Sequence, residues 1–438
     1  MDLDNLDTFR IATCDLNGQM RGKRMPQKDQ RKLASGDLRM PLSVLNVDIW
    51  GADIINSPLL FASGDGDGYL LPTNRGPVPM PWLDQPSALV GMWMFEEDGR
   101  PFEGDPRHAL AQILDRYAAR GWQVVAATEL EFYLIDDSAE SPRPPKDPAS
   151  NRKIDSSAIL SLQQLDAFEA FFSELYQSCA QMGINAQAAS SEAGIGQFEI
   201  SLQHGDALRI ADDTWLFKTL LKGLARKHGY AASFMAKPYP NDAGNGLHLH
   251  FSVIDEAGEN IFDDGTKQGS PLLQNAIAGC LATMRAATLG FAPHANSYTR
   301  MDPENHAPTS ICWGYENRTA ALRIPAGAHR ARRIEHRVAG GDINPFLTLS
   351  LILGAALLGI EDDLTPPPPI TGNAYSQDLP QLIHSWSEAI DMFENDPMIA
   401  RILPAQLIEN FSLTKRQELD GLKNIPQEEH WKIYLETV

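Results

Sequence analysis

The segment VVAATELEFYL, residues 124–134, reads as a buried β-strand that carries two acidic side chains. Glu129 and Glu131 are separated by one residue, so both side chains point to the same face of the strand. Such a pair also occurs on charged edge strands, but the apolar flanks on both sides favour a central strand. Because glutamate is rarely buried without a partner, we expect a cation or a water-filled cleft on this face.

A second apolar stretch carries two histidines in the same arrangement. His248 and His250 follow the loop Asn-Asp-Ala-Gly-Asn-Gly at residues 241–246. One core histidine is usually structural, whereas two on one strand face, next to glycines that let a ligand approach the backbone, also fit a ligand site. Two further acids, Glu192 and Glu199, flank a glycine-containing bend, which is a weak signal by itself.

Arginines are concentrated in residues 317–323 and 330–337 of an otherwise acidic chain. Such a cluster reads either as a solvated face or as a clamp for phosphate and carboxylate groups. Carboxylates with one or two histidines suit Mg²⁺ or Mn²⁺, and arginines suit phosphates, so the pattern predicts ATP-dependent phosphoryl transfer. The usual nucleotide loops are missing, because residues 18–24 are one residue short of a P-loop and residues 194–196 lack the third glycine of a dinucleotide fingerprint.

The composition sets bounds on fold and partners. With 438 residues, the chain exceeds what one hydrophobic core usually serves. Its net charge of −20 argues against binding to nucleic acid or to an anionic membrane and favours a small cationic partner. The four cysteines lie far apart, and the most apolar run falls short of about 20 residues, so we expect neither a disulfide framework nor a transmembrane helix. The sequence therefore predicts a cytoplasmic protein.

The pattern changes near residue 105, where short apolar pieces give way to amphipathic helices that alternate with strands. We therefore predict an α+β protein with a small strand-rich domain at 1–105 and a large domain at 106–438, which ends in a helical tail at 379–438. The expected strands of the small domain cover residues 10–15, 43–50 and 88–95, and the expected helices of the large domain cover residues 109–119, 165–182 and 212–227.

Six motifs, in order along the chain, resemble the successive signatures of the glutamine synthetase family. They are Glu129-x-Glu131, Glu192 with Gln197-x-Glu199, Asn245-Gly246-x-His248-x-His250, Asn296-Ser297-Tyr298-x-Arg300, Asn317-Arg318-Thr319 and Arg332-Arg333-Ile334-Glu335-x-Arg337. The resemblance implies an N-terminal β-grasp domain and a large catalytic α/β domain of the glutamine synthetase type. It also implies a homo-oligomer, a dodecamer of two face-to-face hexameric rings with active sites between adjacent subunits.

The resemblance implies a role for each matching residue as well. Two or more Mg²⁺ or Mn²⁺ ions would be held by two sets of side chains, one set of Glu131, Glu192 and Glu199 and a second of Glu129, His248 and Glu335. Glutamate would be held by Arg300, Arg337 and the backbone at Gly244. The co-substrate ATP would be held by His250, Ser252, Arg318, Arg323 and Arg330, with Arg318 and Arg323 at the transferring phosphoryl group.

The implied reaction begins when the γ-carboxylate of glutamate attacks the γ-phosphoryl group of ATP. Two metal ions and the arginines would offset the like-charge repulsion of this step. An amine would then displace phosphate from the γ-glutamyl phosphate, and exclusion of water would protect that acyl phosphate from hydrolysis.

Several positions depart from family members that use ammonium. In those members a glutamate in the loop after the Arg300 position takes a proton from the nucleophile, whereas here His306 occupies the matching place and Glu304 could serve after a two-residue slip. Ala243 replaces a usual asparagine, and Val47-Asp48-Ile49-Trp50-Gly51 replaces a usual Phe-Asp-Gly-Ser-Ser. The catalytic candidates are therefore Glu304, His306, Asp48 and Arg318.

Because these changes fall where the nucleophile enters, we infer an amine other than ammonium, such as putrescine. Trp50, Trp313 and Tyr315 would offer apolar or cation-π surface to an alkylamine. Motifs at residues 15–24 and 415–435 resemble the γ-glutamylpolyamine (γ-glutamylputrescine) synthetase branch of the family. A glutamine synthetase that uses ammonium and a catalytically silent ring assembly are the alternatives.

Overall fold

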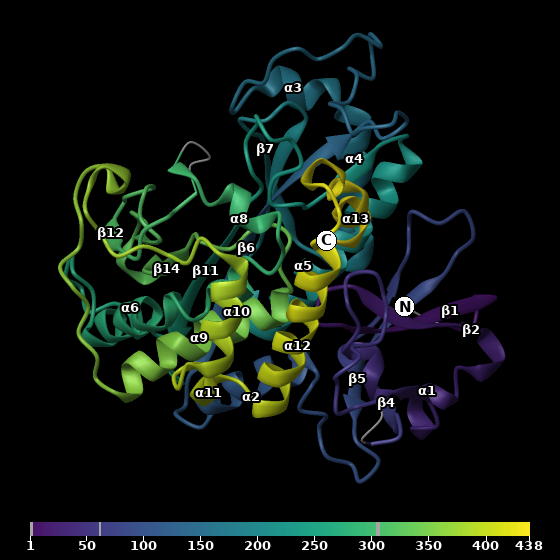
Figure 1. Cartoon of the computed structure of the whole chain (residues 1–438), viewed down its shortest axis with the longest axis horizontal. Helices are drawn as coiled ribbons and strands as arrows, with labels where there is room; N and C mark the ends of the chain where they lie inside the picture. Colours follow the sequence, from purple (N-terminus) through teal and green to yellow (C-terminus); the bar gives the residue numbers. More distant parts are fainter. Residues whose placement is uncertain (1–2, 61–62, 304–306) are drawn as a thin grey trace.

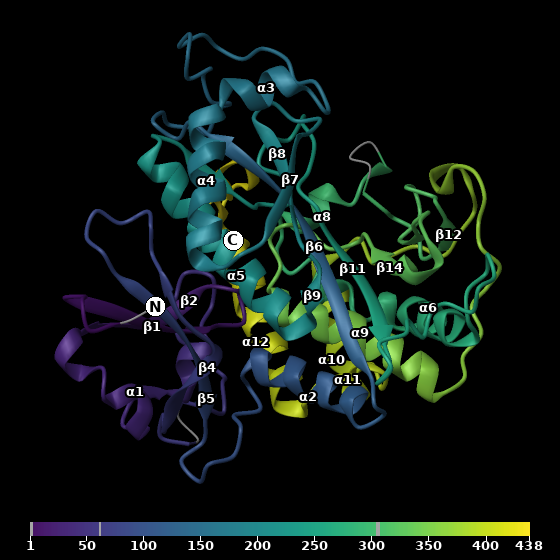
Figure 2. The ribbon, with the colours of Figure 1, turned by 180° about the vertical axis from the view of Figure 1, so that it is seen from behind.

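The computed structural model describes residues 3–60, 63–303 and 307–438. Two sheets lie on different sides of the molecule, and the smaller one is formed by the N-terminal part of the chain (Figure 1, Figure 2). The smaller sheet has the strand order β2-β1-β5-β4-β3. Its strands are β1 (Thr8–Cys14), β2 (Met20–Pro26), β3 (Arg39–Pro41), β4 (Asp67–Pro79) and β5 (Ala88–Phe95).

The smaller sheet is mixed, because β1 pairs antiparallel with β2 and parallel with β5. Alternate residues of these strands point inward, among them Phe9, Ile11, Val90 and Met92, as the period of two in a strand requires. They form a hydrophobic cluster separate from the main core. One face of the smaller sheet therefore has its own core, while residues of the other face, such as Ala12 and Leu89, belong to the main core.

The predicted strand at residues 43–50 is wrong. Residues Leu42–Leu45 form a short 3₁₀ helix, η2, and the chain then turns at Asp48, whose carboxylate accepts hydrogen bonds from the backbone N–H groups of Trp50 and Ala52. A short apolar run does not by itself distinguish a strand from a buried turn.

The larger sheet is built around β6 (Gln123–Ile135), the strand that carries the two glutamates. β6 lies between β11 and β8 in the order β12-β13-β14-β11-β6-β8-β7, which confirms the prediction of a central strand. β9 and β10 also pair with β6. The other strands are β7 (Ala186–Ser191), β8 (Gln197–Leu202), β9 (Gly205–Asp206), β10 (Ala231–Ser233), β11 (Leu247–Ile254), β12 (Trp313–Tyr315), β13 (Leu322–Ile324) and β14 (Ile334–His336).

The apolar helix α9 (Pro345–Glu361) forms the centre of the helical layer and is buried along almost its whole length. It packs against α6 (Pro271–Met284) and α2 (Pro106–Ala118), and these helices lie together in both ribbon views (Figure 1, Figure 2). Glycines allow α6 and α9 to approach closely, because a Cβ added to Gly279 would lie 2.1 Å from the carbonyl oxygen of Ala355. Burial of this layer against the sheet gives the large domain its core.

The remaining helices differ from the predicted ones mainly at their ends. The helix predicted at 165–182 is broken at Phe168, which leaves the α-helical conformation and separates α3 from α4. The tail becomes helical at Trp386 rather than at residue 379. The remaining helices are α1 (Lys32–Ser35), α3 (Leu162–Ala167), α4 (Glu169–Met182), α5 (Ala207–Lys227), α7 (Thr288–Phe291), α8 (Ser297–Arg300), α10 (Trp386–Asn395), α11 (Ile399–Ile402), α12 (Ala405–Leu422) and α13 (Trp431–Thr437).

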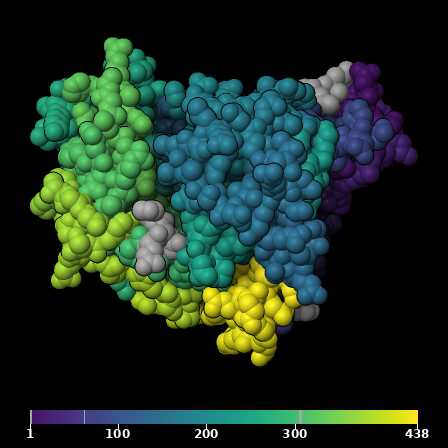
Figure 3. Space-filling view, turned by 90° about the horizontal axis from the view of Figure 1, so that it is seen from above, coloured from purple at the N-terminus to yellow at the C-terminus, as the bar shows by residue number. Residues whose placement is uncertain are grey.

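The helical tail returns to contact earlier parts of the chain. α12 reaches the small domain, where Asn17 donates a hydrogen bond to Glu418. α13 lies beside the end of α5, where Lys222 and Arg226 bind Glu436, and the space-filling view shows these C-terminal residues next to the blue and teal segments (Figure 3). Among the described residues, no helix combines the length and the apolar character that a membrane crossing needs.

Candidate active site

The strand register of the larger sheet collects the predicted ligands on one face. In antiparallel pairs, residues directly opposite each other present their side chains on the same side. Glu129 on β6 is opposite His248 on β11, and Glu131 is opposite Glu199 on β8. On the other side of β11, His250 is opposite Glu335 on β14. These pairings bring residues from four strands to a single face, as the spacing of the two glutamates and of the two histidines predicts.

Glu129 is the centre of this group. Its two carboxylate oxygens lie 3.3 Å from His248 Nδ1 and 3.2 Å from His250 Nε2. Burial alone would raise the pKa of Glu129, but its close contacts with His248 and His250 lower the pKa far below its usual range. Among the described residues, two sets have ligand atoms within 4.8 Å of one another, Glu129 with Glu199 and His248, and Glu129 with His250 and Glu335.

Glu335 joins the acidic group to the arginines. Its two carboxylate oxygens lie 2.5 Å from Arg337 Nη1 and 2.7 Å from Arg323 Nη1, and its side chain is 1% exposed. Burial would raise the pKa of Glu335, but the charges of His248 and Arg337 outweigh it and lower the pKa. The lowered pKa keeps the Glu335 carboxylate ionised, with the two arginines and the histidines of β11 around it.

The residues predicted to bind glutamate adjoin the predicted metal ligands at Gly246. The backbone N–H of Gly246 donates a hydrogen bond to Glu131 Oε2 at 2.6 Å. A Cβ added to Gly246 would lie 2.7 Å from Arg300 Nη2 and 3.5 Å from His248 Nε2. A similar Cβ on Gly244 would lie 2.7 Å from Arg300 Cγ. These glycines allow the arginine to approach the metal-ligand residues closely, as expected from the glycine-rich sequence.

A cavity of about 560 Å³ lies beside the acidic cluster. Its walls include Glu129 and three of the residues predicted to bind ATP, His250, Ser252 and Arg330. A cavity of this size is in the range that proteins use for small-molecule ligands. The structure therefore brings these predicted ATP-binding residues to one hollow, next to the carboxylates.

The donor set fits divalent metal ions. Carboxylate oxygens with one or two histidine nitrogens are the ligands that Mg²⁺ and Mn²⁺ accept. Burial, followed by repulsion from Glu131, raises the pKa of Glu192 to about 7 and that of Glu199 to about 9. These carboxyl groups are close together and largely shielded from water, and too little positive charge lies nearby to balance them. A bound cation would supply that charge.

This electrostatic arrangement gives a testable dependence of stability on metal and pH. When the pKa of a carboxyl group is higher in the folded than in the unfolded protein, the folded state becomes less stable as the pH rises from the lower pKa to the higher one. We therefore expect the melting temperature of the metal-free protein to fall between about pH 5 and about pH 9, and the increase caused by Mg²⁺ or Mn²⁺ to grow over the same interval. Scanning fluorimetry with EDTA or with excess metal measures this, and a metal effect that shrinks with rising pH would contradict it.

Of the four predicted catalytic residues, the structure describes two, Arg318 and Asp48. Arg318 is exposed on a turn that Asn317 and Thr319 tie to the segment after residue 371, through hydrogen bonds to Gly372 O and from Ala374 N. Its charge acts on Glu192, whose pKa it lowers slightly against the larger effect of burial. Glu304 and His306 lie outside the described residues.

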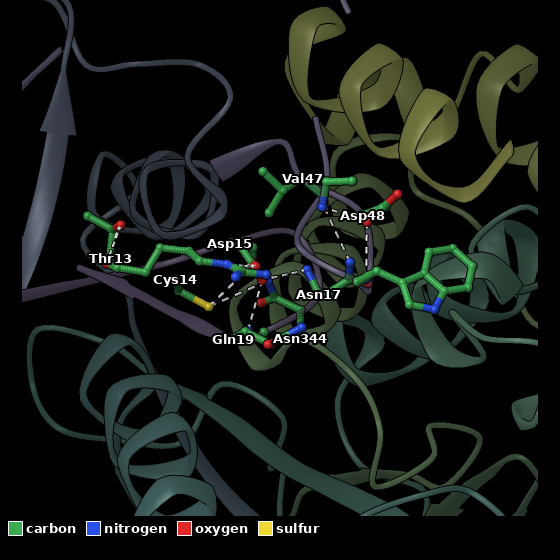
Figure 4. Close-up of polar contacts among 12 residues, drawn as sticks. Thr13, Cys14, Asp15, Asn17, Gln19, Val47, Asp48 and Asn344 are labelled. Carbon is green, nitrogen blue, oxygen red and sulfur yellow. Dashed lines mark hydrogen bonds and ion pairs between the residues drawn. The ribbon is translucent and has the colours of Figure 1, made fainter. Parts of the chain in front are cut away.

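The fourth, Asp48, lies in the small domain and faces α12. Its Oδ2 accepts a hydrogen bond from Gln417 at 2.8 Å, and its Oδ1 caps the following turn. Figure 4 shows the Asp48 turn beside Asn17, whose side-chain amide donates a hydrogen bond to Val47 O. Within the described part of the chain, these contacts connect Asp48 to the small domain and α12 rather than to the metal-ligand cluster.

Two aspects of the predicted site need revision. Trp313 is only 2% exposed, and its indole N–H donates to Pro367 O, so it belongs to the core and offers no open surface to an amine. Trp50 is 43% exposed and keeps that option. Arg333 received no role from the sequence, although its Nε donates to His250 Nδ1 at 3.2 Å and its side chain lines the cavity. Arg333 and Glu335 are two residues apart, a spacing that places both side chains on the same face of a strand, so the sequence held a signal for this role.

Comparisons with known proteins agree with this geometry. The family model of the glutamine synthetase catalytic domain matches residues 103–434. The chain belongs to the glutamine synthetase family. Among its relatives in this family, γ-glutamylputrescine synthetase PuuA of Escherichia coli (strain K12) is 35% identical over 420 residues, covering 95% of this chain and 89% of that protein.

A second glutamine synthetase relative is the glutamate–isopropylamine ligase of Pseudomonas sp, which is 32% identical over 424 residues, 95% of this chain and 92% of that protein. The solved structure of GmaS without ligand superposes with a TM-score of 0.84 at 27% identity and covers 98% of this chain and 96% of its own. The fold is thus of the glutamine synthetase type, with mixed helices and sheets.

Proposed function

We propose that this protein is an ATP-dependent ligase that joins the γ-carboxylate of glutamate to putrescine or another primary amine through γ-glutamyl phosphate. The observation that carries the proposal is the single sheet face on which Glu129, Glu131, Glu199, His248 and Glu335 meet arginines beside a cavity. Such a face suits the binding of a polyphosphate and a carboxylate through divalent ions. The similarity to two glutamate-amine ligases over 95% of the chain supports the same reaction class.

In this proposal the residues have the following roles. Glu131, Glu192 and Glu199 hold one metal ion, and Glu129, His248 and Glu335 hold the other. When bound, these ions supply positive charge that offsets the charge of the reacting phosphate and carboxylate groups. Glutamate is bound by Arg300, Arg337 and Gly244. ATP is bound by His250, Ser252, Arg318, Arg323 and Arg330, with Arg318 and Arg323 at the transferring phosphoryl group. The proton of the attacking amine is accepted by Glu304 or His306, with Asp48 assisting at the amine site.

The proposal extends to the assembly of the protein. The mixed five-stranded sheet of the small domain, 1–105, is proposed to be a β-grasp domain that closes the catalytic domain, 106–438, of an adjacent subunit in a dodecamer of two hexameric rings. Trp50 packs over Gly421 of α12 and is still 43% exposed, which leaves part of its ring free for a contact to another subunit. A cytoplasmic location stays a prediction.

An organic amine is proposed over ammonium because the departures from ammonium-using relatives fall at the amine site. The loop segment with Ala243 is held by Tyr133, whose hydroxyl donates to Ala243 O at 2.7 Å. Trp50 replaces a small polar residue and offers cation-π surface to an alkylammonium group. These features make the amine side of the site more apolar while leaving the metal and glutamate residues in place.

The deciding experiment varies the nucleophile at fixed glutamate and ATP. We expect phosphate release with putrescine or another organic amine to show a kcat/KM at least about tenfold above that with ammonium. The panel includes ammonium, methylamine, ethanolamine, isopropylamine, putrescine and spermidine, each with Mg²⁺ and with Mn²⁺. If ammonium gives the highest kcat/KM, the protein is a glutamine synthetase; if none supports turnover, the ligase proposal fails.

A further inference from the structure

The amide of Gln197 joins two loops of the site. Gln197 is 2% exposed and stands at the start of β8, two residues before Glu199. Its Oε1 accepts a hydrogen bond from Gly194 N at 2.9 Å, so the side chain closes the bend that follows Glu192. Its Nε2 donates to Gly244 O at 2.9 Å and to Asn245 Oδ1 at 3.0 Å. One side chain therefore holds both the bend between two acids and the glycine-rich loop.

Two more contacts tie the same bend, residues 192–197, to the same loop, residues 241–246. The hydroxyl of Tyr133 donates to Ala243 O at 2.7 Å and passes so close to Gly194 that a Cβ there would lie 1.8 Å from the hydroxyl oxygen. The backbone N–H of Ile195 donates to Asp242 Oδ2 at 3.1 Å. Three separate contacts thus hold the two segments in one register.

The other side of the loop is fixed as well. Asn245 donates from its side chain to Met235 O at 2.9 Å, and its backbone N–H donates to Ala236 O at 2.8 Å. Gly244 packs against the side chain of Arg300. Because buried backbone groups need partners, the loop is constrained on both sides, and Gln197 supplies the partner that faces the acidic bend.

We infer that Gln197 is a positioning residue that sets the glutamate-binding loop in register with the bend carrying Glu192 and Glu199, and that Tyr133 is a second positioning residue for the same loop. This inference rests on the proposed function for the identity of the substrate. Gln197 and Tyr133 act through Gly244 and Ala243, so their loss displaces the glutamate contacts while the cavity beside β11 stays intact. The effect is therefore selective for glutamate.

Variants at both positions test this selectivity. Gln197→Leu removes all three amide hydrogen bonds, and Tyr133→Phe removes only the hydroxyl. We expect the KM for glutamate to rise about tenfold in Gln197→Leu and about fivefold in Tyr133→Phe, with the KM for ATP unchanged within about twofold. Gln203→Leu is the matched control, because Gln203 is exposed just after the same strand. Titration calorimetry of glutamate, with and without Mn²⁺, gives a second readout that does not depend on turnover.

The outcomes separate a positioning role from a general structural one. If the KM for ATP rises as much as that for glutamate, or if both variants keep the KM for glutamate within twofold of the original, the inference is overturned. If Gln197→Leu does not fold, Tyr133→Phe decides the question. If the unchanged protein binds glutamate but turns over no amine, the proposed function fails while glutamate calorimetry on the variants still decides the role of the loop.

Discussion

Replacement of Glu129 by glutamine reduces kcat for phosphate release by roughly a hundred- to a thousandfold, the largest effect on turnover that we expect from one substitution. Glu129 belongs to both groups of potential ligands and contacts both His248 and His250. Glutamine keeps the size of the side chain but removes the charge and one oxygen ligand. The variant is measured with the best amine of the panel, at saturating glutamate, ATP and metal.

A matched control is Glu140→Gln, which makes the same change at an exposed position of the chain. The control should keep its activity, and both variants should keep a melting temperature near that of the unchanged protein in EDTA. The two proteins should differ in metal binding, because only Glu129→Gln loses a ligand. If Glu129→Gln retains more than about a tenth of the activity, Glu129 does not hold the metal ions that the reaction needs.

The local features of the site could be predicted from sequence because they depend on the period of a strand. Two glutamates or two histidines separated by one residue share a face wherever the strand lies. The apolar flanks of Glu129 and Glu131 also indicate a central strand, and the pairing of β6 with β11 and β8 confirms it. These inferences need no knowledge of the distant parts of the chain.

The missed features depend on contacts between segments that are far apart in sequence. Arg333 reaches His250 only because β14 pairs with β11 in one register, and a change of register by one residue would turn it to the other face. From the sequence, Trp313 could be an exposed aromatic surface, but in the structure its indole N–H donates a hydrogen bond to Pro367 O in the interior. The turn at Asp48 is closed by local hydrogen bonds to Asp48 Oδ1, but the contact that places it against α12 comes from Gln417, 369 residues further along the chain.

The same limit applies to the two terminal motifs. Sequence resemblance singles out residues 15–24 and 415–435 separately, and the structure shows that they form one buried network. Lys415 donates to Glu418 Oε2 at 2.8 Å and also to Asn17, while Asn17 donates to Glu418 Oε1 at 2.8 Å. The side chains of Lys415 and Glu418 are both fully buried. The network therefore fastens α12 to the small domain.

Lys415→Met is expected to destabilise the protein by about 3–5 kcal/mol, the largest effect on stability among our predictions. The substitution leaves Glu418 buried without its cationic partner, since Asn17 alone cannot neutralise it. Burial already raises the pKa of Glu418, and Lys415 is the strongest opposing influence. Without Lys415 the carboxyl group must become protonated or force its surroundings open, and either outcome costs folding free energy. Equilibrium urea unfolding measures the change.

The comparison that isolates the buried pair uses Lys423→Met and the double variant Lys415→Met with Glu418→Leu. Lys423 pairs with Asp420 at the same spacing of three residues at the end of α12, but both side chains are mostly exposed, so its loss should change little. The double variant removes both charges and should recover much of the stability, because an apolar pair of similar volume carries no desolvation penalty. A double variant as unstable as Lys415→Met would show that shape and the contact to Asn17, rather than the charge of Glu418, determine the stability of this interface.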